Sequence, residues 1–289
     1  MGRQTWGEGV HVGATTPSGG RLAATFARAR AEDRAALVIY LCAGDPSLAD
    51  TPRLVRAAAE AGADIVELGM PFSDPTADGP AIQRASERAL SAGATLPGVL
   101  GALRELRAGG CDVRVVRFGY YIPILAYGEA ELARDAAAAG VDGLLVVDLP
   151  PEEAAPLREP ATAAGLDLVP LVAPTTGIER ARAVAAEATG FVYAVSMTGV
   201  TGSAAGDLAE AGARASELAE ASGRPVAVGF GVKTPEDAAA VAAQADGVVV
   251  GSALVRRVEA AGADVDAAEA SVRELVGALS KACQRPATP

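Results

Sequence analysis

The sequence predicts an α/β protein folded as a single (β/α)8 TIM barrel with an N-terminal extension, and two observations support this prediction. An alanine-rich helical stretch, a glycine, one spacer, an aspartate and a short apolar run recur together roughly every 25 to 45 residues. Helical patterns also separate all of the apolar runs along the chain. Regular alternation of strands and helices implies parallel strands joined by right-handed crossovers, and eight such units close a barrel.

This repeated pattern of glycine, spacer and aspartate, called the recurring phrase below, explains how each helix ends and the next strand begins. Its glycine suits the left-handed residue that ends a helix, and the polar step turns the chain into a buried strand. Helix openings agree, because Asp50-Thr51-Pro52 and Thr234-Pro235 place a capping residue and a proline at a first turn. The phrase occurs at Gly62-Ala63-Asp64, Gly110-Cys111-Asp112, Gly140-Val141-Asp142 and Gly165-Leu166-Asp167, and without its glycine at Ala245-Asp246.

The apolar runs define the expected strands and the domain limits. A doubly wound open sheet is the alternative, but the turn Cys42-Ala43-Gly44-Asp45-Pro46 after the first strand is not the GxGxxG of that fold. We expect residues 1–30 to form a flexible extension and the start of the first helix, and residues 31–284 to form the barrel. The expected strands are 36–41, 64–68, 113–118, 143–147, 167–172, 190–195, 225–229 and 246–250.

Composition narrows the possible functions. The 289 residues carry a formal charge of −11, which argues against nucleic acid or an anionic membrane as the main partner. The three scattered cysteines have no metal or redox spacing and indicate a reducing cytoplasm. The single histidine, His11, lies in the extension, so acid–base chemistry in the barrel falls to Asp, Glu, Tyr or Lys. We expect no metal site.

Glycines at two adjacent strand ends predict a phosphate site. The seventh expected strand ends in Gly229-Phe230-Gly231, and the eighth runs into Gly251-Ser252 at the start of a helix. Backbone N–H groups can approach an anion closely there, although the glycines alone are also compatible with tight turns. The small-residue segment 196–206 after the sixth strand is compatible with a mobile lid or with an ordinary connection.

Carboxylates gather at the end of the second expected strand. Strand alternation puts Glu67 on the same face as Ile65. If this face is the inward one, apolar walls at the end of the barrel should raise the pKa of Glu67. The following loop carries Asp74 and Asp78, so two carboxylates of unequal pKa can reach one substrate, a common acid–base division. The alternative is that Glu67 belongs to a structural ion pair and that the aspartates cap turns.

The segment from Glu67 to Gln83, ELGMPFSDPTADGPAIQ, resembles the signature of the tryptophan synthase alpha subunit family. The resemblance covers about residues 30 to 260. Further matching motifs are Gly44-Asp45-Pro46, Tyr120-Tyr121, Asp148-Leu149-Pro150, Gly199-Val200-Thr201-Gly202, Gly229-Phe230-Gly231 and Gly251-Ser252.

The resemblance implies a retro-aldol cleavage of indole-3-glycerol phosphate to indole and glyceraldehyde 3-phosphate. Glu67 would be the acid–base group and Asp78 would bind the indole N–H, with Thr201 orienting Asp78. No cofactor is implied for this chain, because the pyridoxal phosphate of the full reaction belongs to a separate β subunit. The implied substrate contacts are Tyr40, Phe118, Tyr120, Tyr193, Thr201, Gly202 and Phe230, and the implied phosphate contacts are Gly202, Gly229, Gly231, Gly251 and Ser252.

One stretch departs from the family pattern. Isoleucine occupies position 122 where members usually have asparagine, Phe118 and Gly119 stand near a usual methionine and threonine, and Arg117 interrupts an apolar strand. The implied β-subunit interface includes Asp74, Ile122 and Pro150, so the change at Ile122 bears on coupling. A stand-alone lyase that releases free indole and a catalytically weak regulatory partner are the alternatives; the presence of Glu67 and Asp78 counts against the second. An isomerase fits the Asp-rich loop poorly.

Overall fold

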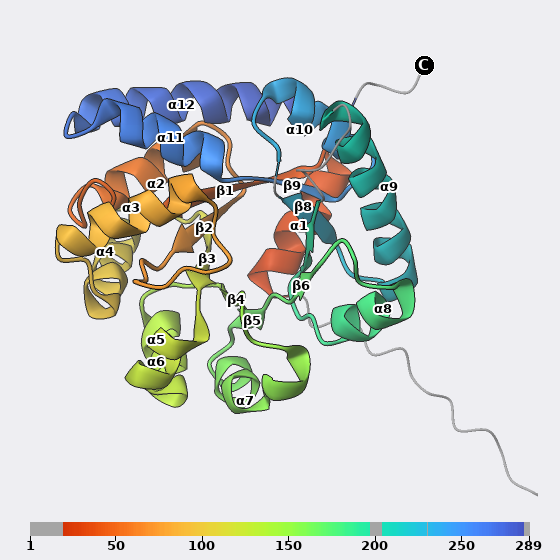
Figure 1. Cartoon of the computed structure of the whole chain (residues 1–289), viewed down its shortest axis with the longest axis horizontal. Coiled ribbons are helices and arrows are strands. Elements are labelled where there is room, and N and C mark those ends of the chain that lie inside the picture. Colours follow the sequence, from red (N-terminus) through yellow and green to blue (C-terminus); the bar gives the residue numbers. More distant parts are fainter. Residues whose placement is uncertain (1–19, 197–203, 230, 286–289) are drawn as a thin grey trace, which may run out of the picture.

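In the computed structural model of the protein, the described residues are 20–196, 204–229 and 231–285 (Figure 1). They contain a parallel sheet of nine strand segments in the order β5-β4-β3-β2-β1-β9-β8-β7-β6. Every strand predicted from the sequence is confirmed. The segments are β1 (Ala36–Cys42), β2 (Ile65–Gly69), β3 (Arg114–Gly119), β4 (Gly143–Val146), β5 (Asp167–Leu168), β6 (Leu171–Val172), β7 (Val192–Val195), β8 (Val226–Gly229) and β9 (Gly247–Val250).

The fifth predicted strand, 167–172, is divided into β5 and β6 at Pro170, which has no N–H to give to a ladder. The segment β5 pairs with β4, and β6 pairs with β7. Between them, the Val169 N–H donates to the Leu144 carbonyl at 2.9 Å, and the Pro170 carbonyl accepts from the Tyr193 N–H at 3.0 Å. One continuous stretch therefore joins the two ends of the strand order, and eight predicted strands close the barrel.

Helices form an outer ring around the strands (Figure 1). No helix in the described ranges is long and apolar enough to cross a membrane. The helices are α1 (Arg21–Ala31), α2 (Thr51–Glu60), α3 (Pro80–Ser91), α4 (Leu96–Ala108), α5 (Tyr121–Tyr127), α6 (Glu129–Ala138), α7 (Ala155–Ala163), α8 (Ile178–Ala186), α9 (Ala204–Ser222), α10 (Pro235–Ala242), α11 (Ser252–Ala261) and α12 (Val265–Ala282), with a 3-10 turn η1 (Pro151–Glu153).

The predicted helix ends are largely confirmed. All four glycines of the recurring phrase have a positive φ, between 77° and 112°, a conformation that side chains rarely adopt. Thr234 and Asp237 form a capping box at the start of α10. Asp50 occupies the N-cap of α2 without a side-chain capping bond; instead the Thr51 hydroxyl accepts from the Gly44 N–H at 2.9 Å.

Two apolar layers lie on opposite faces of the strands. Side chains that alternate inward, such as Val38, Tyr40 and Cys42, fill the barrel, while those between them pack against the helices. From α1, Leu22 and Phe26 join the inward-facing cluster, and the Phe26 ring lies 5.0 Å from that of Phe191. Helix α1 therefore closes the N-terminal end of the barrel and leaves the opposite rim for the site.

The aspartates of the recurring phrase connect neighbouring strands at that N-terminal end. Asp64, Asp142 and Asp246 accept hydrogen bonds from the backbone N–H groups of Leu37, Val115 and Val226, respectively, at 2.8 to 3.0 Å. The sequence pattern predicted only a polar step in a turn, and not this hydrogen bond from the preceding strand. Each aspartate satisfies a buried backbone donor that would otherwise lack a partner.

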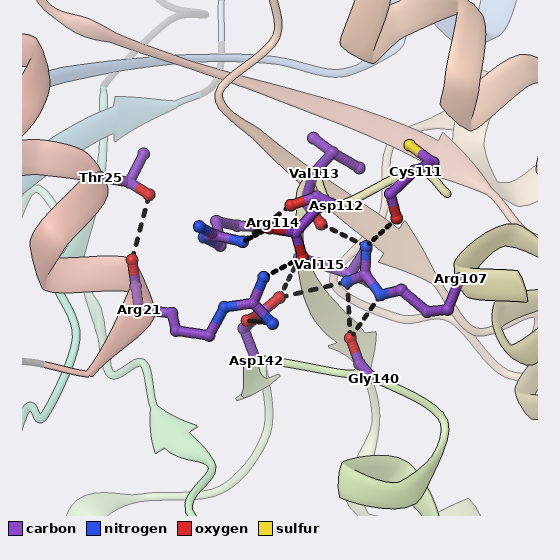
Figure 2. A network of polar contacts seen from close by, with 10 residues as sticks. All are labelled: Arg21, Thr25, Arg107, Cys111, Asp112, Val113, Arg114, Val115, Gly140 and Asp142. Atoms are coloured by element: carbon purple, nitrogen blue, oxygen red, sulfur yellow. Dashed lines mark hydrogen bonds and ion pairs between the residues drawn. The ribbon is translucent and has the colours of Figure 1, made fainter. Parts of the chain in front are cut away.

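Asp142 also belongs to an arginine network (Figure 2). Arg21 lies 3.2 Å from one of its oxygens, and Arg107 lies 3.4 Å from the other. Arg107 also donates to the carbonyls of Gly140 and Val113, at 2.6 and 2.7 Å. The network thus fastens α1 and the end of α4 to strands β3 and β4.

We expect Asp142→Ala to lower the free energy of unfolding by about 1.5–3 kcal/mol, because the Val115 N–H and two arginines lose a buried acceptor. The matched control is Asp112→Ala, which removes another partner of Arg21. The Asp112 side chain is 75 % exposed, and exposed pairs contribute about 0–1 kcal/mol. Urea unfolding measures both changes. Equal losses in the two variants would contradict the assigned role of Asp142.

Candidate active site

Four side chains converge inside the C-terminal half of the barrel. Tyr40 on β1, Phe118 on β3 and Tyr193 on β7 belong to the inward-facing cluster. Glu67 lies two residues beyond inward-facing Ile65 on β2 and is paired in register with Tyr40. Glu67 therefore faces inward, an orientation that the sequence left open, and the group lies where barrel enzymes place their active sites.

Glu67 is a buried carboxyl group with little to compensate its charge. It is 1 % exposed, and its Oε1 atom has no hydrogen-bond partner among the described residues. Burial alone raises the pKa of Glu67 to about 8, so the group carries a proton at neutral pH. Within the described ranges Glu67 forms no ion pair, which argues against the alternative interpretation as a structural ion-pair member.

Asp78 lies in the loop after β2 and is held by two polar contacts. The Tyr120 hydroxyl donates to its Oδ2 at 3.1 Å, and the side-chain amide of Gln83 donates to its carbonyl at 2.9 Å. Burial raises the pKa of Asp78 to about 6, against the lowering effect of the Tyr120 hydrogen bond. Asp78 is therefore mainly ionised at neutral pH while Glu67 is mainly protonated.

Tyr120 has a contact that sequence reasoning missed. It was expected to touch substrate, but its hydroxyl also accepts from the Ala77 N–H at 3.0 Å and so spans the backbone and carboxylate of the Asp78 loop. The Phe72 ring of the same loop lies 5.2 Å from the Tyr120 ring. A tyrosine two residues beyond the third expected strand was the available signal, but its partner is 42 residues away in sequence.

Aromatic rings form the walls beside Glu67. The rings of Tyr40 and Phe118 meet edge-on at 5.3 Å. A Cβ atom at Gly69 would overlap the Tyr40 hydroxyl, and one at Gly229 would overlap that of Tyr193. Both glycines leave room for a phenol, so Gly229 has a packing reason beside its expected phosphate contact. Burial raises the pKa of both tyrosines well above the ordinary value.

The seventh and eighth predicted strands correspond to β8 and β9, which pair in parallel. Gly229 ends β8, Gly231 follows with a φ of 85°, and Gly251 caps α11, whose first residue is Ser252. The predicted phosphate residues that the structure describes thus lie at adjacent strand ends beside a helix N-terminus, which attracts anions. Thr201, Gly202, Phe230 and the greater part of the 196–206 segment lie outside the described residues.

The residues expected at a partner interface lie on the surface. Asp74 and Pro150 are exposed, and Ile122, on α5, is 61 % exposed. They follow β2, β4 and β3, respectively, so they belong to the C-terminal side of the barrel. In the described part of the chain, no cluster of three or more His, Cys, Asp or Glu side chains is arranged to hold a metal ion.

A closed (β/α)8 barrel with one protonated and one ionised carboxyl group at its C-terminal mouth defines an acid–base enzyme of the barrel class. Comparison with known proteins identifies the family. The profile of the tryptophan synthase alpha chain family matches residues 26–284. The tryptophan synthase alpha chain of Geobacter sulfurreducens is 53 % identical over 262 residues, which cover 89 % of this chain and 99 % of that protein.

Other relatives and solved structures agree. The alpha chain of Phenylobacterium zucineum is 49 % identical over 262 residues, covering 91 % of this chain and 95 % of its own. A Mycobacterium tuberculosis tryptophan synthase structure matches with a TM-score of 0.81 at 38 % identity, over 93 % of this chain and 100 % of that one. The structure of the tryptophan synthase alpha chain of Legionella pneumophila matches with a TM-score of 0.83 at 35 % identity, over 93 % of this chain and 99 % of that one. The chain belongs to the tryptophan synthase alpha chain family, a family of lyases.

The buried state of Glu67 predicts a pH-dependent stability. Because its pKa rises from 4.5 to about 8, the folded protein holds an extra proton between these values, and stability falls as the pH rises through this interval. Glutamine stays neutral at every pH, so the free energy of unfolding of Glu67→Gln should rise relative to that of the wild type between about pH 5 and about pH 8. The difference should grow by up to about 1.4 kcal/mol per pH unit. Urea unfolding across this range measures the difference. Parallel curves for the two proteins would rule out the raised pKa.

Proposed function

We propose that this chain cleaves indole-3-glycerol phosphate to indole and glyceraldehyde 3-phosphate, as the alpha subunit of a tryptophan synthase. The observation that carries the proposal is the pair of carboxyl groups, with Glu67 buried and protonated inside the barrel and Asp78 ionised in the adjacent loop. A retro-aldol reaction on an indole needs a proton donor for carbon and a fixed anion for the cation that results.

Glu67 supplies and recovers one proton. Its carboxylic acid protonates indole C3, which gives an indolenine cation. The bond between C3 and the glycerol carbon then breaks, its electrons return to the ring, and indole is restored. The hydroxyl on that glycerol carbon loses its proton to the Glu67 carboxylate and becomes the aldehyde of glyceraldehyde 3-phosphate. A pKa near neutrality suits a group that acts as acid and then as base.

Asp78 stabilises the positive charge that develops on the indole nitrogen. Its carboxylate accepts the indole N–H, and the Tyr120 hydroxyl holds it in one orientation. An anion fixed before the reaction stabilises the transition state without reorganisation. Thr201 adds a second support for Asp78 by family resemblance.

The remaining rim residues hold the two ends of the substrate. The phosphate group is bound by backbone N–H groups of Gly202, Gly229, Gly231, Gly251 and Ser252, with the N-terminus of α11 adding a favourable dipole. The indole ring lies between aromatic and apolar walls. Tyr40, Phe118 and Tyr193 form these walls, and Phe230 adds a further contact to the ring by family resemblance.

Release of indole from indole-3-glycerol phosphate by the purified chain tests the function. We expect Glu67→Gln and Asp78→Asn to lower kcat by about 10²–10⁴-fold and to fold normally. Asp74→Asn is the matched control, because this exposed aspartate of the same loop is assigned to the partner side and should change kcat little without a partner. More than about a tenth of wild-type kcat in Glu67→Gln would refute its role.

Coupling to a β subunit is expected to be weak. Family members usually have an asparagine at the position of Ile122. An asparagine side chain can donate and accept hydrogen bonds, whereas an isoleucine side chain can do neither. A partner group left unpaired in an interface costs about 1–3 kcal/mol, which is comparable to a typical allosteric coupling energy. The exposed position of Ile122 is compatible with such a contact.

We therefore expect useful lyase activity from the chain alone and only modest stimulation by its cognate β subunit. Ile122→Asn should increase the stimulation, since it provides the missing hydrogen-bonding group. Indole release is measured for both chains with and without the β subunit. Stimulation of the wild-type chain above about a hundredfold from near-zero basal activity would show intact coupling and contradict the expectation.

A further inference from the structure

Arg117 is a buried cation for which the sequence offers no explanation. It lies on β3 between inward-facing Val116 and Phe118, so its side chain points to the helix side of the barrel. It is 2 % exposed, and none of its three guanidinium nitrogens has a hydrogen-bond partner among the described residues. Burial lowers the pKa of Arg117 to about 10, so the group is still charged at neutral pH.

The guanidinium extends along the strand towards the C-terminal rim. Gly119 lies two residues further on the same face, and a Cβ atom there would be 3.5 Å from both terminal nitrogens of Arg117. The guanidinium therefore lies directly beside Gly119, at ordinary van der Waals distance from where a side chain would begin. The register neighbours of Arg117 are Leu68 on β2 and Leu144 on β4, so its lateral surroundings are apolar.

Asp148 follows β4 two residues beyond Val146, which pairs with Gly119, so the strand register brings it to the same rim as the Arg117 guanidinium. The two residues form no direct ion pair in the described part of the chain, but the negative charge of Asp148 favours the charged form of Arg117. The Asp148 carboxylate accepts from the Tyr121 N–H at 2.8 Å, at the first residue of α5. Tyr121 directly follows Tyr120, whose hydroxyl holds Asp78. A short series of contacts therefore runs from Asp148 to the proposed catalytic carboxylate.

We propose that Arg117 is a positioning residue, whose buried charge holds Asp148 over the start of α5 and thereby fixes Tyr120 and the carboxylate of Asp78. A buried charge without a close partner is unfavourable for stability, and an apolar side chain of similar length between two leucines is often tolerated or stabilising. The charge therefore opposes stability at this position, so its favourable contribution is expected at the site and not in the packing of the barrel. The part of the proposal that concerns catalysis rests on the proposed lyase function.

The first test is the amide hydrogen exchange of Tyr121, measured by NMR on the full chain. Arg117→Met removes the charge, and Asp148→Asn removes its partner charge while keeping an acceptor for the Tyr121 N–H. Each should speed exchange at Tyr121 by roughly twofold to fivefold, the range expected for a partly exposed charge pair. In the variant that carries both substitutions, Tyr121 should exchange little faster than in either single variant. Arg117→Met should also melt no lower than wild type.

Arg114→Met is the matched control, because Arg114 lies on the same strand at the opposite end of the barrel and pairs with Asp112. It should leave Tyr121 exchange unchanged. The proposal would be overturned if Tyr121 exchange were unchanged in Asp148→Asn. It would also be overturned if the effects of Arg117→Met and Asp148→Asn on this exchange added in full in the double variant. Asp148→Asn alters an exposed side chain, so this result does not depend on how well Arg117→Met folds.

The second test is steady-state cleavage of indole-3-glycerol phosphate. Arg117→Met should lower kcat by about threefold to tenfold with KM nearly unchanged, because Asp78 acts mainly in the transition state. Arg117→Lys keeps the charge and should recover part of kcat, which a role in packing alone would not predict. A change in KM alone would contradict the positioning role. Absence of indole release by the wild-type chain would instead reject the lyase function, while the exchange experiment would still decide the role of Arg117.

Discussion

The two-residue alternation of side chains along parallel strands determines where the functional groups of this protein lie. On β1, β2 and β3 the inward positions carry apolar residues near the N-terminal end and Tyr40, Glu67 and Phe118 nearer the C-terminal end, and β7 adds inward-facing Tyr193. Because α1 fills the N-terminal opening with Leu22 and Phe26, only the C-terminal opening is left for a substrate. A shift of one residue in any of these strands would exchange its inward and outward faces and dismantle the site.

Asp64, just before β2, and Glu67, on β2 towards the opposite end of the barrel, have opposite surroundings. At the N-terminal end Asp64 accepts the Leu37 N–H and contacts Arg34 and Arg28 at 2.6 and 2.9 Å. At the C-terminal end Glu67 has no ion pair among the described residues, and burial raises its pKa to about 8. Satisfied charges hold strands together, whereas an unsatisfied carboxyl group retains a proton that chemistry can use. Along β2, the stabilising carboxylate and the carboxyl group available for chemistry therefore lie towards opposite ends of the barrel, and the second is on the side where barrel enzymes place their active sites.

Sequence patterns predicted the features that depend on local periodicity. The eight strands, the left-handed glycines of the recurring phrase and the shared face of Ile65 and Glu67 all follow from neighbours within a few residues. Features that depend on long-range partners could not be predicted in this way. The break at Pro170, the strand N–H bound by Asp142, and the contact of Tyr120 with Asp78 each need the assembled barrel. Gly69 and Gly229 show the same limit, because the tyrosine that each accommodates lies on a neighbouring strand.

The aromatic walls have a second consequence for the chemistry. The pKa of Glu67 is raised by desolvation alone, so its proton is retained only while the surrounding rings exclude water. Tyr40, Phe118 and Tyr193 are each no more than 5 % exposed, and the first two pack edge to face. The same side chains that shape the proposed indole slot therefore set the strength of the acid beside it. Substrate fit and acid strength are thus linked through packing, and a cavity opened in these walls would weaken both together.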